Sequence, residues 1–155
     1  MCEEIRFKYS SGDYGFLSNF HKNIFIADGI KWQTSEHYYQ YKKLKFVQSL
    51  GDPVTDEFIE EVINASTPKR AKQLGHRKVE HIDEWDEIKV LAMEDVLRMK
   101  FKKKFLRQCL INTGDAILIE DNQYDNFLAA GRSDDGQNML GKCLMKIRDE
   151  LNLSK

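Results

Sequence analysis

Proline and glycine are scarce in this sequence, with 2 and 9 among 155 residues. Collagen-like and low-complexity chains need far more of both, and disordered chains carry far less apolar content than the 41% present here. No stretch approaches the roughly 18 consecutive apolar residues of a membrane-spanning helix. The sequence therefore predicts an ordinary globular protein with no membrane partner.

Cysteine is also rare, and its placement excludes two further classes. The three residues, Cys2, Cys109 and Cys143, are odd in number, far apart and without a C-x-x-C pair. Neither a disulfide framework nor a cysteine zinc site is therefore expected. The first residues lack the basic and hydrophobic segments of a secretion signal, so we expect the protein in the cytoplasm.

Length and charge bound the organisation of the chain. We expect residues 1–155 to form one domain, because 155 residues suffice for one hydrophobic core. The net charge of −1 hides a basic run, in which six of the ten residues from Arg98 to Arg107 are basic. Such a run is either a solvated helix face or a contact surface for nucleic-acid phosphates, and composition leaves both open.

Strand patterns are few. Residues 5–9 alternate apolar and charged side chains, as in a half-buried strand, and residues 116–120 are rich in strand-forming types. Residues 24–26 and 30–32 flank Asp28 and Gly29, which tolerate positive φ, and this arrangement predicts a hairpin.

Helical periodicity covers most of the remaining chain. Capping residues and helix breakers predict helices over 36–50 after Thr34 or Ser35, 55–63, 67–75, from Asp83 to about 101, 105–112, and from Asn138 to the C-terminus. Strands do not alternate regularly with helices. The expected fold class is therefore α+β, a mostly helical single domain with a small antiparallel sheet.

Motifs for several common activities are absent. There is no G-x-G-x-x-G, no G-x-x-x-x-G-K-[ST] and no G-x-S-x-G. The four histidines lack the spacing of metal ligands. We therefore expect no metal and no cofactor.

One helical stripe carries a suggestive set of chemical groups. Glu36, Tyr39, Gln40 and Lys43 recur at spacings that place a carboxyl, a phenol, an amide and an amine on one face. This stripe is either an exposed polar face or the wall of a pocket. In a pocket, the carboxyl can exchange a proton and the desolvated amine can act as a nucleophile, which suits glycosidic chemistry.

The order of motifs along residues 5–151 resembles the NADAR (YbiA-like) family. The matching positions are residues 14–20, Asp28, Gly29, Trp32, residues 34–40, Lys43, residues 71–75, Trp85, Met93, Lys100, Phe101, residues 113–115, Glu120, Asp125 and residues 136–141. The resemblance implies a compact, mostly helical α+β fold that needs no metal. It also implies cleavage of N-glycosidic bonds to ribose.

The resemblance assigns roles to several positions. It implies that Glu36 supplies the carboxylate at the scissile bond and that Lys43 attacks the anomeric carbon of an opened ribose. Asp125 and Asn138 match positions that orient ribose hydroxyls or the base. The remaining expected substrate-binding residues are Ser18, Asn19, Phe20, Tyr39, Arg70, Trp85, Lys100 and Gly136.

Some of these residues also have ordinary interpretations. Trp85 begins an apolar helix stripe and suits a core position, and Asp125 alone suits a turn. Lys100 either extends to solvent or contacts a substrate phosphate. Arg70 and Lys72 are either phosphate contacts or surface charge.

The sequence departs from the family pattern in one loop. Where relatives read Asp-x-x-Trp-Gly-x-Gly, Leu128 and Ala129 stand at the Trp and Gly positions. The missing indole is a platform for base stacking, a contact worth roughly 1–3 kcal/mol. Phe127 or Trp85 is available to replace it. Because Glu36, Lys43 and Asp125 all remain, the departure affects the identity of the substrate more than the type of bond.

Three functions follow from the resemblance. The first is an N-glycosidase that hydrolyses the ribose C1–N bond of phosphorylated ribosylamines, such as intermediates of riboflavin biosynthesis. The second removes ADP-ribose from guanine in nucleic acid or nucleotides, with the basic run supplying affinity for the strand. The third is a non-catalytic module that binds ADP-ribose or a nucleotide. The expected partner is thus a phosphoribosyl or ADP-ribosyl small molecule.

Overall fold

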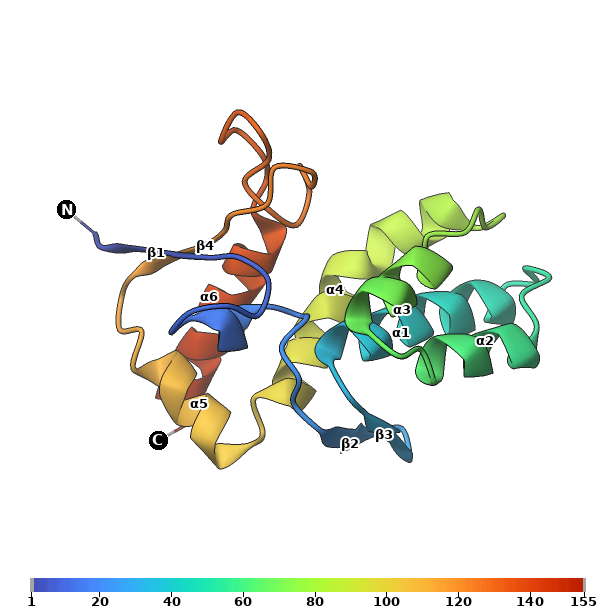
Figure 1. Ribbon diagram of the computed structural model, residues 1–155, viewed down its shortest axis with the longest axis horizontal. Helices are drawn as coiled ribbons and strands as arrows, with labels where there is room; N and C mark the ends of the chain where they lie inside the picture. Colours follow the sequence, from blue (N-terminus) through green and yellow to red (C-terminus); the bar gives the residue numbers. More distant parts are fainter. Residues whose placement is uncertain (1, 155) are drawn as a thin grey trace.

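The computed structural model describes residues 2–154, and Met1 and Lys155, the ends of the expected domain, lie outside that range. The elements are β1 (Glu4–Phe7), a 3-10 turn (Gly15–Leu17), β2 (Phe25–Ala27), β3 (Ile30–Trp32), α1 (Ser35–Ser49), α2 (Asp56–Ile63), α3 (Pro68–Gly75), α4 (Ile82–Lys100), α5 (Lys104–Ile111), β4 (Ile117–Glu120) and α6 (Met139–Leu153). Figure 1 shows these elements, and the expected mostly helical α+β class is confirmed.

The strands form two separate pairs. β2 and β3 make the expected antiparallel hairpin, in which Asp28 and Gly29 adopt φ values of 52° and 71°. β1 pairs with β4 in parallel, with Ile5 opposite Leu118. The sequence predicted only an antiparallel sheet. Because the partners of the parallel pair lie more than a hundred residues apart, no turn between them could reveal the pairing.

Side-chain caps define three of the six α-helix starts among residues 2–154. Thr34, Thr55 and Thr67 precede α1, α2 and α3, and each hydroxyl accepts a hydrogen bond from the backbone N–H three residues later. One expected cap is misplaced, and another stands at the expected position without a capping bond. α4 begins at Ile82, one residue before Asp83. Asn138 precedes α6 at a φ of 48° but makes no capping bond, because its amide is hydrogen-bonded to β4 instead.

Helix α4 joins two groups of elements. α1 packs against α2, α3 and the first part of α4, whereas α6 packs against α4, α5 and β4 (Figure 1). The hydrophobic core runs through both groups and includes the fully buried Trp32, Leu44, Leu97 and Leu144. No helix among residues 2–154 is long and apolar enough to cross a membrane. The segment between β4 and α6 lies where the two groups meet, and there it helps to form a cavity.

A buried carboxylate connects α4 to α6. The Glu94 side chain is only 8% exposed, and it accepts hydrogen bonds from Lys146 Nζ at 2.9 and 3.0 Å and from Arg98 at 3.4 Å. Arg98 also donates two hydrogen bonds to Glu150 on α6, at 2.8 and 2.9 Å. These charge-assisted contacts fix the position of α6 on α4.

Replacing Glu94 should therefore cost much more stability than replacing its exposed neighbour. Glu94→Ala removes hydrogen bonds to two cations, and we expect the free energy of unfolding to fall by about 2 kcal/mol. Asp95→Ala serves as the control, because Asp95 also contacts Arg98 but is 59% exposed. The free energy of unfolding of this variant should fall by less than about 0.5 kcal/mol. Urea denaturation of the two variants measures both values, and equal losses would contradict the role of Glu94.

Candidate active site

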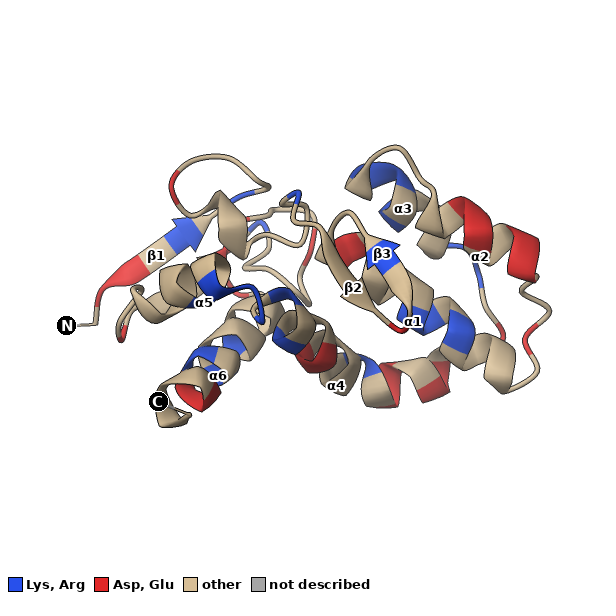
Figure 2. Ribbon diagram, turned by 90° about the horizontal axis from the view of Figure 1, so that it is seen from below, with Lys and Arg blue, Asp and Glu red and all other residues tan. Residues whose placement is uncertain are grey.

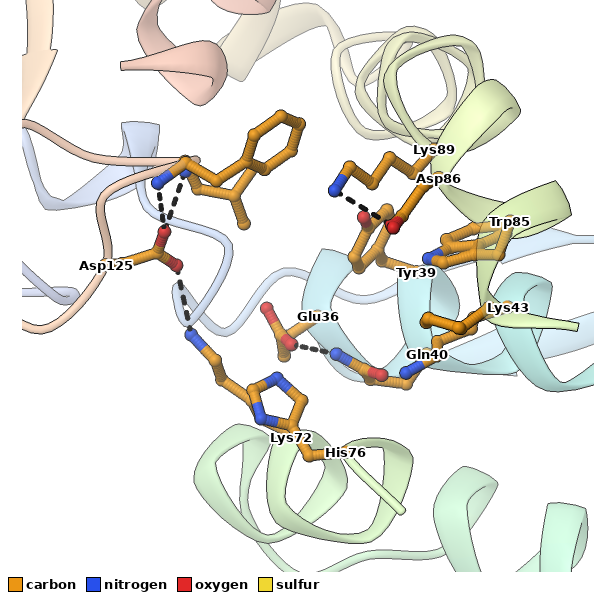
Figure 3. A pocket seen from close by; sticks show the side chains of 13 residues that line it. Glu36, Tyr39, Gln40, Lys43, Lys72, His76, Trp85, Asp86, Lys89 and Asp125 are labelled. Atoms are coloured by element: carbon orange, nitrogen blue, oxygen red, sulfur yellow. Dashed lines mark hydrogen bonds and ion pairs between the residues drawn. The ribbon is translucent and has the colours of Figure 1, made fainter. Parts of the chain in front are cut away.

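A cavity of about 210 Å³ lies where α1, α3, α4 and the segment after β4 meet. Its opposite walls come from residues far apart in the sequence (Figure 3). The lining residues are Glu36, Tyr39, Gln40, Lys43, Lys72, His76, Ile82, Trp85, Asp86, Lys89, Asp125, Phe127 and Leu128. This set contains three carboxylates and three lysines, so the cavity suits a polar ligand.

The polar stripe of α1 forms one wall of this cavity. Glu36, Tyr39, Gln40 and Lys43 are all buried, and all four line the cavity. The start of the helix is held in place because Asn19 accepts hydrogen bonds from the Glu36 backbone N–H at 3.1 Å and from the side chain of the preceding serine. Of the two interpretations of the stripe, the structure supports the pocket wall.

Glu36 is the most deeply placed acid of the cavity. Its Oε1 accepts a hydrogen bond of 2.7 Å from Gln40 Nε2, one helical turn later. Burial raises the pKa of the Glu36 carboxyl, while the Lys72 ammonium and the Gln40 hydrogen bond oppose the rise. The group therefore keeps its proton to a higher pH than an exposed glutamate, as acid–base catalysis near neutrality requires.

Gly75, at the end of α3, makes room for this arrangement. A Cβ at Gly75 would collide with Oε1 of Gln40, so only glycine lets the amide reach Glu36. The Gly75 carbonyl also accepts a hydrogen bond of 2.8 Å from Lys43 Nζ. One residue of α3 thus positions both the amide and the amine of α1.

Lys43 is buried and has the properties of a reactive amine. Burial lowers the pKa of its ammonium, and Lys89 lowers it further, while Asp86 opposes the change. A larger neutral fraction makes the amine a better nucleophile at neutral pH.

Asp125 closes the cavity from the opposite side. Its Oδ1 accepts hydrogen bonds from the backbone N–H groups of Phe127 and Leu128, at 2.9 and 2.7 Å. Its Oδ2 faces Lys72 Nζ on α3 at 3.7 Å (Figure 3). The carboxylate therefore shapes its own loop and connects that loop to α3.

Aromatic side chains complete the walls. Lys89 Nζ lies 3.8 Å from the centre of the Phe127 ring and 3.0 Å from Asp86, which attaches the loop to α4. Trp85 is 3% exposed and packs against Tyr39, with ring centres 5.5 Å apart. Trp85 is thus both a core residue and part of the cavity wall.

A second, much smaller chamber adjoins the cavity. It has a volume of about 20 Å³ and shares Glu36, Lys72 and Leu128 with the larger space. The expected site residues Ser18, Asn19 and Phe20 line this chamber, together with Tyr9, Glu120 and Asn122.

Four expected substrate-binding residues line neither space. Lys100 is completely buried, and its Nζ donates a hydrogen bond of 2.8 Å to the Ser18 carbonyl. Arg70 is exposed on α3. Gly136 donates its N–H to the Ala130 carbonyl within the loop. The sequence suggested that Lys100 and Gly136 contact the ligand. In the structure they instead bind backbone carbonyls behind the walls.

Asn138, the fourth of these residues, connects the loop to β4. Its Oδ1 accepts a hydrogen bond from the Glu120 N–H, and its Nδ2 donates one to the Leu118 carbonyl. Gly141 lies close behind, where a Cβ would collide with the Leu118 carbonyl oxygen. These contacts place Asn138 beneath the site, in contact with backbone groups of β4.

Sequence reasoning passed over several lining residues. Asp86 and Lys89 follow Trp85 on α4 and pair at 3.0 Å. Their i, i+3 spacing is the only local signal, and it is equally typical of an exposed ion pair. His76 follows the C-terminus of α3 and carries no motif of its own.

The basic run is less available than its composition suggests. Lys100 is buried, and Arg98 is engaged by Glu150, Glu94 and Asp95. Acidic residues gather on α2 and basic residues on α3, away from this run (Figure 2). The similar proteins do not support the nucleic-acid contact, one of the two interpretations of the run, and Lys102, Lys103 and Lys104 remain exposed as on a solvated surface.

Comparison with known proteins identifies the family. The NADAR domain family model matches residues 6–152. N-glycosidase YbiA of Escherichia coli is 33% identical over 153 residues, which cover 97% of this chain and 90% of the relative. This chain belongs to the NADAR family. N-glycosidase Npun_R5314 of Nostoc punctiforme is 36% identical over 140 residues, covering 89% of this chain and 86% of that protein.

A solved NADAR structure agrees with the fold. The NMR structure of E. coli YbiA superposes with a TM-score of 0.81 at 31% identity, over 99% of this chain and 88% of that one. Riboflavin biosynthesis protein VVA0006 of Vibrio vulnificus is 32% identical over 153 residues, which cover 97% of this chain and 39% of that protein. The two relatives that this chain matches over most of their length, YbiA and Npun_R5314, are both named N-glycosidase. N-glycosidases are hydrolases that act on N-glycosyl bonds.

The buried Lys100 leads to a prediction about stability and pH. Burial lowers the pKa of its ammonium to about 7. Between about pH 7 and 10 the unfolded chain therefore holds a proton that the folded chain has lost, so the contribution of Lys100 to stability rises with pH and is constant below that window.

Lys100→Met should remove this rise. From about pH 7.5 to about pH 9 the free energy of unfolding of the wild type should gain roughly 2 kcal/mol relative to the variant. Urea denaturation at the two pH values measures the difference. Lys102→Met, at an exposed position nearby, should follow the wild type; the same pH slope in all three proteins would disprove the assignment.

Proposed function

We propose that this chain is an N-glycosidase that hydrolyses the bond between ribose C1 and a nitrogen in a phosphorylated ribosylamine of the riboflavin-intermediate type. The observation that carries the proposal is the meeting of Glu36, Lys43 and Asp125 around one cavity of about 210 Å³. Relatives named N-glycosidase YbiA and riboflavin biosynthesis protein support both the bond type and the substrate class.

Glu36 is the group that acts at the scissile bond in this proposal. As the C1–N bond breaks, positive charge develops on C1 and the ring oxygen, and a fixed carboxylate nearby stabilises it. Gln40 holds one carboxylate oxygen at 2.7 Å. The other oxygen has no hydrogen-bond donor among the described residues and is free to face the sugar.

Lys43 offers a covalent route through the same cavity. In its neutral form, the amine displaces the base nitrogen from C1 of a ring-opened ribose, which gives a Schiff base that water then hydrolyses. The lowered pKa of Lys43 supports this role. The hydrogen bond to the Gly75 carbonyl fixes the direction of the amine.

The surroundings of Lys43 support a phosphorylated substrate. The cavity continues into a basic groove of about 400 Å³, whose lining includes Lys43, His76, Arg77 and Lys78. A ribose phosphate has one reactive end and one anionic end, and the combined space offers carboxylates to the first and cations to the second. Phe127 and Leu128 supply an apolar wall for the base, with Leu128 at the tryptophan position of the family pattern that the sequence resembles.

Glu36→Gln should abolish base release while preserving binding. Loss of the ionisable carboxyl should lower kcat by roughly 10²- to 10⁴-fold, because the amide can neither carry charge nor exchange a proton. Released base is measured over a phosphoribosylaminopyrimidine, NAD and ADP-ribosyl guanosine, and affinity by calorimetry with ADP-ribose. Glu87→Gln, on the exposed face of α4, is the matched control.

Two outcomes of this series would count against the proposal. Base release only from ADP-ribosyl guanosine would replace the ribosylamine by an ADP-ribosylated substrate. Binding of ADP-ribose by the wild type, with no base released from any compound, would identify a binding module in place of an enzyme.

Borohydride trapping tests the covalent route separately. Reduction during turnover should add the mass of a ribose phosphate to the protein at Lys43, since a Schiff base is reduced to a stable amine. Lys43→Met should give no adduct, whereas Lys45→Met, at an exposed position of the same helix, should be labelled like the wild type. An active enzyme without an adduct would restrict Lys43 to binding or electrostatic stabilisation.

A further inference from the structure

The small chamber beside Glu36 has the size of one water molecule. Its volume of about 20 Å³ exceeds the roughly 10–15 Å³ that a water needs. A buried water also needs two to four polar partners. The chamber is far too small for a sugar or a base, so water is the ligand that fits it.

Glu120, on the chamber wall, is a carboxyl that the proposed mechanism does not yet use. It ends β4, and its backbone is held on both sides, because its N–H donates to Asn138 Oδ1 at 3.0 Å and its carbonyl accepts from the Ala130 N–H at 2.9 Å. Its carboxylate makes no hydrogen bond or ion pair with residues 2–154. This half-buried carboxylate is therefore free to accept a hydrogen bond from a water in the chamber.

Glu36 lies on the same chamber with one oxygen equally available. Its Oε1 is bound to Gln40, whereas Oε2 has no protein donor within the described part of the chain. The Lys72 ammonium also lines the chamber. Two carboxyls and one ammonium thus surround a water-sized space that shares the Glu36 wall with the cavity for the sugar.

We propose that this chamber holds the water that hydrolyses the glycosidic bond and that Glu120 is the base that takes its proton. The inference rests on the proposed N-glycosidase function and adds a catalytic residue to it. On the direct route, without a Lys43 adduct, one O–H bond of the water breaks, its proton passes to Glu120, and the oxygen bonds to C1. The electron pair of the C1–N bond goes to the base nitrogen, which gains a proton from solvent while Glu120 returns its own.

The electrostatic surroundings of Glu120 agree with this role. Burial raises the pKa of its carboxyl to about 7, and the nearby Asp125 and Glu36 carboxylates raise it while Lys72 lowers it. Tyr9 is the other titratable side chain on the chamber wall. A base with a pKa near the working pH combines a useful ionised fraction with sufficient basicity.

Glu120→Gln tests the proposal on the substrate of the base-release series that the wild type turns over fastest. We expect kcat to fall by roughly 10²- to 10⁴-fold, with KM within about threefold. The acidic limb of kcat/KM near pH 7 should disappear. Asp121→Asn is the matched control, because this neighbouring carboxylate is 56% exposed and lies outside the chamber; it should keep the wild-type rate and profile.

Azide distinguishes a base from a residue that only supports the fold. Azide is a nucleophile that needs no deprotonation, so it should restore C1–N cleavage in Glu120→Ala and form a ribosyl azide, while leaving Glu36→Gln inactive. A structural role of Glu120 predicts no such rescue. Should Glu120→Gln fail to fold by circular dichroism, Glu120→Asp carries the test, with a reduced rate and a retained acidic limb expected.

The possible failures are separable. An active wild type together with a folded Glu120→Gln variant of unchanged rate and pH profile overturns the role of Glu120 and leaves the N-glycosidase function intact. Loss of rate in Glu120→Ala without azide rescue also overturns it. A wild type that frees no base from any compound overturns the proposed function itself.

Discussion

The burial of a polar helix face is the constraint on which the site depends. α1 turns Glu36, Gln40 and Lys43 towards the interior, and desolvation penalises both charges. Specific polar contacts offset this cost: the Gly75 carbonyl of the neighbouring α3 accepts from the amine, and the Gln40 amide of α1 itself donates to the acid. The same desolvation brings the two pKa values closer together, so the arrangement that costs stability also prepares the groups for chemistry.

Supporting residues behind the walls are as important as the walls themselves. Lys100 and Asn138 line neither cavity, yet each is hydrogen-bonded to the backbone of a residue that lines the small chamber. Lys100 binds Ser18, and Asn138 binds Glu120. Asp125 also has a supporting role, because one of its carboxylate oxygens binds the backbone of its own loop while the other faces Lys72. Motif residues in this chain therefore divide into those that line the site and those that hold its backbone in place.

Local patterns predicted the helices and the stripe of α1, because capping threonines and a 3.6-residue period are visible within a few residues. The parallel pairing of β1 with β4 depends on contacts between distant segments and left no local signal. For the site, the family motifs pointed to Glu36, Lys43 and Asp125, and all three line one cavity. The motifs could not distinguish contact from support, because Trp85 and Lys100 both match family positions, yet Trp85 lines the cavity and Lys100 binds the backbone behind it.

The pairing of β1 with β4 also has a consequence for folding. Glu120 and the loop that carries Asp125 are placed by β4, whose partner β1 lies more than a hundred residues earlier in the chain. Contacts of such long sequence separation form late and slowly. The helices α1 to α4 can therefore associate before β1 and β4 pair, so the wall that carries Glu120 and Asp125 is the last part of the cavity to form.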